Sequence, residues 1–275
     1  MKKKGFTLIE LLAVIVILAI IALIATPLVL KYIEKSRQES FRVSTEGIKD
    51  AVNYYIVEKT TKGEALANPE IIDVQDLDLK NKSNLSGRVI IHKVEKDYIV
   101  SYDNITDGKY VLTGNSKEEL MDVNSVKDST NPMLITNDEK VVIDHYKNYV
   151  YGIDDINNVE SKFEVINGEL EYAKNSSGTY STGAKLNVLK DGQIYKTYTI
   201  ICFGDITGDA VIDVIDAAFV PRLKKDPNWT YDHFTADVNR NGVVDDDDRY
   251  LITQLTMKKA TINQTTGKIT LNQES

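Results

Sequence analysis

One uninterrupted apolar segment near the N-terminus constrains this chain more than any other feature. From Phe6 to Leu30 the sequence holds a single charged residue, Glu10, and three lysines occupy positions 2–4 just before it. As a helix rising about 1.5 Å per residue, the segment is roughly 37 Å long, which is enough to cross a bilayer. The lysines favour a cytoplasmic N-terminus, so the rest of the chain is expected outside the cell.

Glu10 is the unusual residue of this segment. A carboxylate inside hydrocarbon costs roughly 2.5–3.5 kcal/mol on insertion scales, so it is expected to serve a function and to have a partner. A cleaved secretory signal is a poor explanation, because such signals have about 7–15 apolar residues followed by an A-x-A-like site. Here the apolar run is longer, and its sharp boundary lies at its start, between Gly5 and Phe6.

The stretch Lys4-Gly5-Phe6-Thr7-Leu8-Ile9-Glu10 closely resembles the prepilin leader of type IV pilins and of the related pseudopilins. The resemblance implies that a prepilin peptidase cleaves after Gly5 and methylates the new amine of Phe6. It also implies that Glu10 of one subunit faces that amine on a neighbouring subunit during filament assembly. The alternative is that Glu10 only reaches the membrane interface. The implied partners are other pilin subunits and the membrane, and the implied location is the cell membrane, followed by a surface filament.

Beyond Pro27 the pattern predicts that one helix continues to about Lys59. Apolar residues recur there at steps of three and four, which is typical of an amphipathic helix with one buried face: Phe41, Ile48, Ala51, Val52, Tyr55 and Ile56. Residues 63–85 are polar and are expected to form a loop. The alternating runs at 88–94, 97–102 and 109–114 predict an antiparallel meander on which the helix packs.

A polar linker is expected at 116–133, and a second, all-β module at 134–203. This module resembles the small β-module that often precedes dockerin domains in surface proteins of anaerobic bacteria. The residues that carry this resemblance are Tyr149, Val150, Tyr151, Gly152, Ser181, Thr182, Gly183, Tyr198, Gly204 and Asp205. The single cysteine, Cys202, allows no internal disulfide and is expected to be a small buried apolar residue.

Two acidic segments near the C-terminus repeat at an offset of 32 residues: DITGDAVIDVID at 205–216 and DVNRNGVVDDDD at 237–248. Each is typical of a twelve-residue calcium loop followed by a helix, in which alternate residues point inward and a last carboxylate closes the site. Hard oxygen ligands suit Ca²⁺. The predicted ligands of two Ca²⁺ sites are Asp205, Thr207, Asp209, the Val211 carbonyl, Asp213 and Asp216, then Asp237, Asn239, Asn241, the Val243 carbonyl, Asp245 and Asp248.

The remaining residues of this region are expected to build its core. Ile212 and Val244 hold the same position in the two loops and should face the space between them. Trp229, Tyr231 and Phe234 lie between the repeats and should close the small core.

Residues 204–257 resemble a type I dockerin domain on these two loops. The resemblance implies a cohesin partner, contacted by the pairs just before each last ligand: Val214 and Ile215, then Asp246 and Asp247. Because the pairs differ, one docking orientation is expected. The alternative is that the domain is only a calcium-stapled cap.

Three departures accompany this resemblance. Ala210 stands where positive φ favours glycine, Thr207 replaces Asn or Asp, and Pro221 is expected to interrupt the first helix. The tail at 258–275 alternates like a hairpin that could clasp the domain.

Charge and motifs exclude other functions. The formal net charge of −8 argues against nucleic acid as the main partner. His92, His145 and His233 show no metal-type spacing, and no catalytic motif is present, so no enzymatic activity is expected.

Together these features predict an α+β protein. It has a leader at 1–5, a transmembrane helix at 6–30, a pilin-like head at 31–115, the β-module and the α-helical paired-loop domain. The predicted function is a minor or tip filament subunit that displays a calcium-bound dockerin-like domain for adhesion or cohesin docking. Two alternatives remain: a pseudopilin of a type II secretion or competence system, and a membrane-tethered display protein that does not polymerise.

Overall fold

The computed structural model describes residues 8–80, 85–94, 96–115, 121–122, 131–136, 138–226 and 228–272. The chain divides into two compact units, residues 1–46 and 47–275. The predicted α+β class is confirmed: one long helix is followed by several antiparallel sheets and by short helices near the C-terminus.

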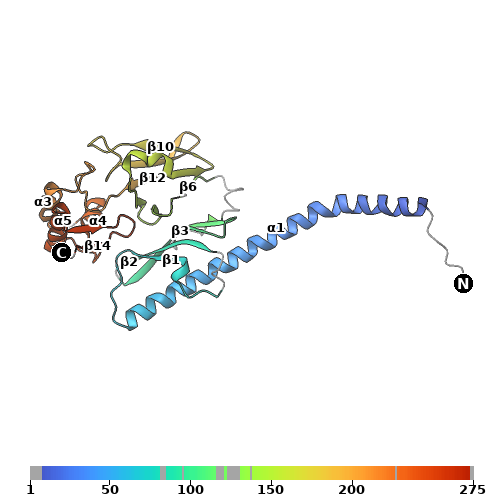
Figure 1. The fold of residues 1–275 in the computed structure, drawn as a ribbon, viewed down its shortest axis with the longest axis horizontal. Helices are drawn as coiled ribbons and strands as arrows, with labels where there is room; N and C mark the ends of the chain where they lie inside the picture. The colour runs from blue at the N-terminus through green and yellow to red at the C-terminus, as the bar shows by residue number, and fades with distance from the viewer. Residues whose placement is uncertain are drawn as a thin grey trace. The chain divides into compact units, whose positions relative to one another are not determined.

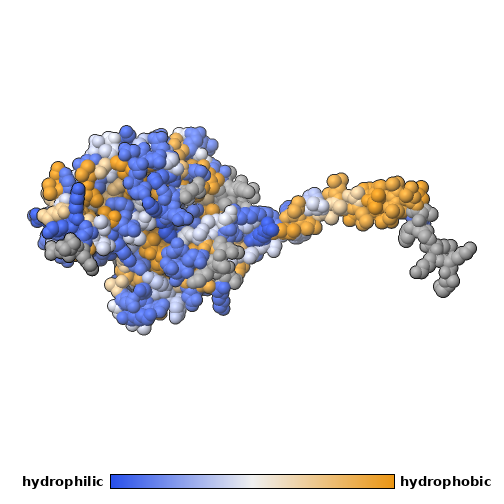
Figure 2. Space-filling view, in the orientation of Figure 1, coloured by the Kyte–Doolittle hydropathy of each residue, from blue (hydrophilic) through white to orange (hydrophobic). Residues whose placement is uncertain are grey.

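Helix α1 (Leu8–Thr61) supplies the described part of the first unit. Its side chains are exposed through the apolar segment, where an 18-residue window has a mean hydropathy of 3.2 with 0% buried. By length and composition the helix can therefore cross a membrane, and Figure 2 shows its hydrophobic surface. Pro27 lies inside the helix, which continues past it. Proline removes one backbone hydrogen bond, and the ribbon bends in its N-terminal part in Figure 1.

The second unit begins within the last turns of α1, where the predicted buried face is confirmed at Ile48, Ala51, Val52 and Ile56. The Tyr55 hydroxyl donates to the Glu70 carboxylate at 2.9 Å, which joins this end of the helix to strand β1.

A five-stranded antiparallel sheet, the head sheet, follows the order β1-β2-β3-β4-β5. Its strands are β1 (Glu70–Asp73), β2 (Ser86–Val94), β3 (Asp97–Thr106), β4 (Val111–Asn115) and β5 (Met121–Asp122). The predicted three-strand meander is confirmed as β2 to β4. The expectation of a plain loop at 63–85 is wrong, because Ile71 and Ile72 are embedded in strand β1. Most of the predicted linker at 116–133 lies outside the described residues, but Met121–Asp122 pair with β4.

The β-module holds a second five-stranded sheet in the order β10-β11-β12-β8-β7, and a separate pair of β6 and β9. Its strands are β6 (Met133–Thr136), β7 (Val142–Asp144), β8 (Tyr149–Tyr151), β9 (Phe163–Ile166), β10 (Glu169–Ala173), β11 (Lys185–Lys190) and β12 (Gln193–Ile200). The 3₁₀ segment η2 (Ile156–Lys162) precedes β9. Strands β12 and β8 are parallel, whereas the other neighbours are antiparallel. Cys202 is buried just after β12, and burial raises the pKa of its thiol to about 11.

The C-terminal part contains α3 (Val214–Leu223), α4 (Tyr231–Ala236), α5 (Asp246–Thr256) and the hairpin β13 (Ala260–Ile262)–β14 (Ile269–Leu271). The predicted tail hairpin is confirmed, and Ile262 and Ile269 pack on the core of this domain. Pro221 does not interrupt α3, contrary to expectation, because it lies in the last turn, where little helix remains to be disrupted.

The expected closing aromatics behave differently from one another. Trp229 is 43% exposed and only stacks against the His233 ring, so its predicted core role is wrong. Phe234 is buried, but it packs in a cluster shared with the other modules rather than in the core between the two loops.

That shared cluster joins the head sheet, the β-module and the C-terminal domain. Its fully buried members are Ile90, Val142, Tyr151, Ile201, Phe203 and Phe234. A buried polar contact lies between the same modules: His92 Nε2 in β2 is 2.8 Å from Asp144 Oδ2 in β7. The three modules therefore share one apolar cluster within the second unit, beside the separate cores of the β-module and the C-terminal domain.

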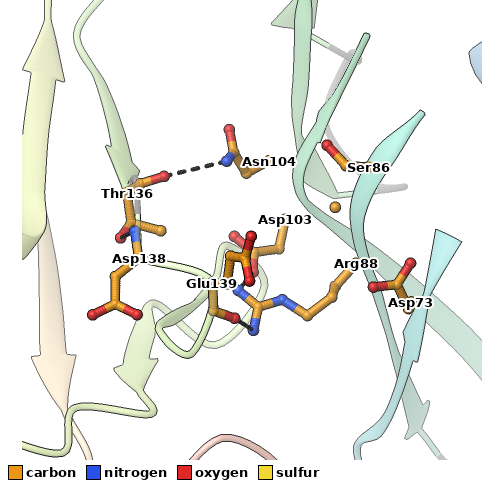
Figure 3. A pocket seen from close by; sticks show the side chains of 9 residues that line it. Asp73, Ser86, Arg88, Asp103, Asn104, Thr136, Asp138 and Glu139 are labelled. Atoms are coloured by element: carbon orange, nitrogen blue, oxygen red, sulfur yellow. Dashed lines mark hydrogen bonds and ion pairs between the residues drawn. The ribbon is translucent and has the colours of Figure 1, made fainter. Parts of the chain in front are cut away.

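A polar pocket of about 460 Å³ opens between the head sheet and the β-module (Figure 3). Arg88 crosses it, donating to the Glu139 carbonyl at 2.8 Å and to the Val141 carbonyl, and pairs with Asp103 at 3.0 Å. Burial raises the pKa of Asp103 to about 6. Arg88 thus ties the start of the β-module to the head sheet.

The tight packing predicts unequal effects of alanine at two glycines of the β-module. Both have positive φ, but a Cβ on Gly152 would lie 1.9 Å from the Lys140 carbonyl oxygen, whereas a Cβ on Gly178 meets nothing within 4 Å. Gly178→Ala should cost about 1–2 kcal/mol from its left-handed backbone, and Gly152→Ala should cost a further ~1–3 kcal/mol from the clash. Thermal unfolding of both variants checks this, and equal melting temperatures would contradict the packing described.

Candidate metal centre

Two loops of the C-terminal domain, Asp205–Asp216 and Asp237–Asp248, adopt the same backbone arrangement at the predicted offset of 32 residues. The sixth residue of each has positive φ, 77° at Ala210 and 83° at Gly242. Glycine tolerates this conformation freely, whereas alanine is strained there by roughly 1–2 kcal/mol. The predicted strain at Ala210 is therefore present in the structure.

The first residue of each loop holds the turn through backbone N–H groups. Asp205 accepts from the N–H of Gly208 at 2.9 Å and of Ala210 at 3.0 Å. Asp237 accepts from the N–H of Asn241 at 3.1 Å and of Gly242 at 2.9 Å. Each loop is thus wrapped around the carboxylate with which it begins.

The last residue of each loop closes it from the other side. Asp216 accepts from the N–H groups of Thr207 and Asp213, each at 2.9 Å. Asp248 accepts from the N–H of Val238 at 2.9 Å, and from that of Asp245 at 3.0 Å. One carboxylate therefore joins the beginning of its loop to the start of the following helix.

The ninth residue of each loop caps that helix. Asp213 accepts from the Ile215 N–H at 2.6 Å and forms a capping box with Asp216. Asp245 accepts from the Asp247 N–H at 2.9 Å and forms the equivalent box with Asp248. Capping satisfies N–H groups that the first helical turn leaves without partners, which explains why helices α3 and α5 begin where they do.

The carboxyl groups that begin and end each loop are buried. Asp205, Asp216, Asp237 and Asp248 are at most 2% exposed. Within the described residues, neither Asp205 nor Asp216 forms an ion pair with a Lys, Arg or His side chain. Burial raises the pKa of both carboxyls, and it raises the pKa of Asp248 to about 6. Buried carboxylates of this kind are stabilised when a cation shares the site.

The donor set fits a hard cation. The Thr207 hydroxyl is buried, has no partner of ordinary hydrogen-bond geometry, and lies near the Asp216 carboxylate. Asp209 and Asn241, at the fifth position of each loop, accept from the N–H two residues later, which fixes their side chains on the loop. Oxygen from carboxylates, amides, a hydroxyl and carbonyls is what Ca²⁺ prefers. No group of three His, Cys, Asp or Glu side chains stands ready to hold a metal among the described residues. The predicted sets also include Thr207, the two Asn side chains and two backbone carbonyls.

Residues 203–255 match the dockerin type I domain. Residues 1–26 match the prokaryotic N-terminal methylation motif. Both family resemblances drawn from the sequence, at the N-terminal and the C-terminal end of the chain, are thus confirmed. Type I dockerin domains bind calcium. Neither matched family is enzymatic. No curated protein and no solved structure matches the chain.

The other predicted site residues are not among the predicted loop ligands. The processing residues Gly5 and Phe6 lie outside the described residues, and Glu10 lies on an exposed face of α1. Val214 and Ile215 are 67% and 51% exposed on α3 of the dockerin-type domain. Asp246 and Asp247 are exposed on α5, and Asp246 pairs with Lys224 at 2.8 Å. Ile212 and Val244 face the core between the loops, as predicted.

Three residues around the loops were not found from the sequence. Arg240 is 3% exposed, and its guanidinium lies 4.5 Å from the Phe203 ring centroid and 4.3 Å from that of Phe234. Ser181 and Asn175 of the β-module contact the first loop. No local motif marks them, because an arginine in an acidic loop or a serine in a polar turn is ordinarily solvated.

Calcium binding should weaken in acid. If Asp248 is a ligand, as predicted, it must be deprotonated to bind calcium, and burial raises its pKa to about 6 in the calcium-free chain. Below that pH the affinity of the second loop should fall by up to about tenfold per pH unit. At fixed calcium, the calcium-induced rise in melting temperature should therefore be smaller at about pH 5 than at about pH 7. An equal rise at both values would show that Asp248 is not a ligand.

Proposed function

We propose that this chain is a type IV pilin-like filament subunit that displays a calcium-bound dockerin-type domain outside the cell. The carrying observation is the pairing of an N-terminal methylation motif with a dockerin type I match on one chain. A single apolar helix can anchor the precursor in the membrane, and the modules of the second unit are then carried outward. Because a large head repeated at every lattice step would crowd a helical filament, a minor or tip position suits it better than a shaft position.

Assembly depends on Glu10 in this proposal. Cleavage after Gly5 leaves Phe6 with a positively charged, methylated amine, and Glu10 of an adjacent subunit pairs with it. In a low dielectric such a pair is stable when both members are present, and removal of one leaves an uncompensated charge. The pair therefore sets the register between subunits and makes the acidic residue tolerable in the membrane.

The dockerin-type domain binds two Ca²⁺ ions in this proposal, one in each loop, through the twelve ligands predicted from the sequence. Burial of all four loop-closing carboxylates supports this assignment, and so does the lack of an ion pair to Asp205 or Asp216 among the described residues. In the second loop the buried Arg240 guanidinium offsets part of the charge of Asp237. Calcium would offset their charge and hold helices α3 and α5, which lie against each other. The chemistry is structural: a rigid domain presents two helix faces to a partner.

The partner proposed for these faces is a cohesin domain, and the first repeat is the better docking face. Val214 and Ile215 expose apolar surface, whose burial favours association. Asp246 and Asp247 are charged, and Asp246 already pairs with Lys224. Docking through the second repeat would require removing these charges from water, so the faces are unequal and one orientation is favoured.

Filament assembly is tested by Glu10→Gln, which keeps the size of the side chain and removes its charge. We expect incorporation into surface filaments to fall by about tenfold or more, because the Phe6 amine loses its partner. Glu34→Gln, farther along the same helix, is the matched control and should assemble normally. Normal assembly of Glu10→Gln would contradict the role given to Glu10, and absence of the wild-type chain from filaments would favour a membrane-tethered display protein instead.

Docking is tested by capture of the full chain, in detergent micelles, on immobilised cohesin domains with calcium or with EGTA. Capture should require calcium and should weaken at least about tenfold in Val214→Ser/Ile215→Ser, because these side chains bury apolar surface in the complex. Asp246→Ser/Asp247→Ser is the control pair and should retain capture. If no cohesin retains the wild-type chain under either condition, the docking role is wrong and the domain is a structural cap.

A further inference from the structure

The β-module contacts the first calcium loop through one turn, residues 175–182 between β10 and β11, which we call the accessory loop. The Asn175 side-chain amide donates to the Gly208 carbonyl at 2.7 Å and to the Thr182 carbonyl at 2.8 Å. The Thr179 hydroxyl donates to the same Gly208 carbonyl at 2.7 Å. Two side chains of another module thus bind one carbonyl of the calcium loop.

Ser181 reaches the carboxylate at the first position of that loop. Its side chain is 1% exposed, and its hydroxyl donates to Asp205 Oδ2, the same oxygen that accepts from the Ala210 N–H at 3.0 Å. Since Oδ1 accepts from the Gly208 N–H at 2.9 Å, the carboxylate is held by three donors. Its orientation is therefore fixed jointly by the loop and by the β-module.

The close approach depends on glycine at the fourth position of the first loop. A Cβ on Gly208 would lie 2.4 Å from the Thr182 carbonyl oxygen and 2.7 Å from Asn175 Nδ2. The fourth position of the second loop is Arg240, whose side chain instead stacks on Phe203 and Phe234. The two calcium loops have similar backbones, but they differ at their fourth residue. In the first calcium loop this residue, Gly208, contacts the accessory loop.

The second loop is attached elsewhere. The carbonyl of Arg240 accepts from the backbone N–H of Asn68, in the segment that joins α1 to the head sheet, at 3.0 Å. No side chain of the β-module donates to Asp237, among the hydrogen bonds of the described residues. A contact specific to Asp205 therefore distinguishes the first loop from the second.

We infer that the accessory loop is part of the first calcium site, and that Ser181 is a positioning residue that holds Asp205 in the orientation needed to bind the ion. Hydrogen bonds from outside the ligand shell orient ligands, and their loss typically costs about 10–100-fold in metal affinity. The first loop has particular need of such support, because it carries the strained Ala210 and a threonine at its third position. The inference rests on the calcium binding proposed above, but not on filament assembly or docking.

The test is calorimetric titration of the full chain, in detergent micelles, with calcium chloride. Ser181→Ala should weaken one of two binding steps by about tenfold or more and leave the other within about twofold. Ser161→Ala is the matched control, since this exposed serine of the same module donates only to the Asn158 carbonyl. Asp209→Ala and Asn241→Ala each remove one ligand from one loop, and thereby assign the two steps.

A second variant, Thr179→Val, keeps the test valid if Ser181→Ala fails to fold. Thr179→Val preserves shape but removes a donor to Gly208, and it should weaken the same step as Ser181→Ala by a smaller factor. Unchanged affinity in Ser181→Ala, or an equal loss in both steps, would overturn the inference while leaving calcium binding intact. Absence of any calcium binding by the wild-type chain would instead overturn the proposed calcium sites, and this inference with them.

Discussion

Two buried carboxylates, Asp216 and Asp248, hold the C-terminal domain together. Each joins the beginning of its loop to the first turn of the following helix, and neither is measurably exposed. Burial of negative charge is unfavourable unless a cation or sufficient hydrogen bonding offsets it. In the proposed function, the carboxylate that closes each loop is therefore also one that a divalent cation would stabilise. If calcium fills both loops, as proposed, the folding of this domain and the binding of calcium are one process.

The two acidic loops are also among the points at which the domain meets the rest of the second unit. The carbonyl at the fourth position of each loop accepts hydrogen bonds from a different module: Gly208 from the β-module, and Arg240 from the segment before the head sheet. Arg240 also packs against two aromatic rings of the shared cluster, Phe203 and Phe234. A change in the conformation of either loop therefore alters the contact between that loop and its own neighbouring module. Attached in this way, the dockerin-type domain is held against the other modules while Val214 and Ile215 of α3 stay exposed.

Local patterns in the sequence predicted the parts of the structure that lie within one segment. The apolar run, the alternation in β2 to β4, the paired loops and the positive φ of Ala210 all follow from residue spacing. The wrong or missed predictions concern residues whose surroundings are contributed by segments distant in the sequence. Strand β1 was missed because it is short and pairs only when β2 is present. Trp229 was assigned to a core by its size, and Phe234 to the core of its own domain. Arg240 and Ser181 depend on surfaces contributed by modules distant in sequence.

The proposed function depends on the binding of two calcium ions, one at each loop. It also requires that the pilin-type helix anchors the chain. Native mass spectrometry of the full chain, released from detergent micelles after equilibration with calcium, tests the calcium binding most directly. We expect a dominant species with two bound ions, both removed by EGTA and neither replaced by magnesium at equal concentration. A chain that retains no calcium, or binds a variable number of ions without a defined stoichiometry, would contradict the two-site proposal.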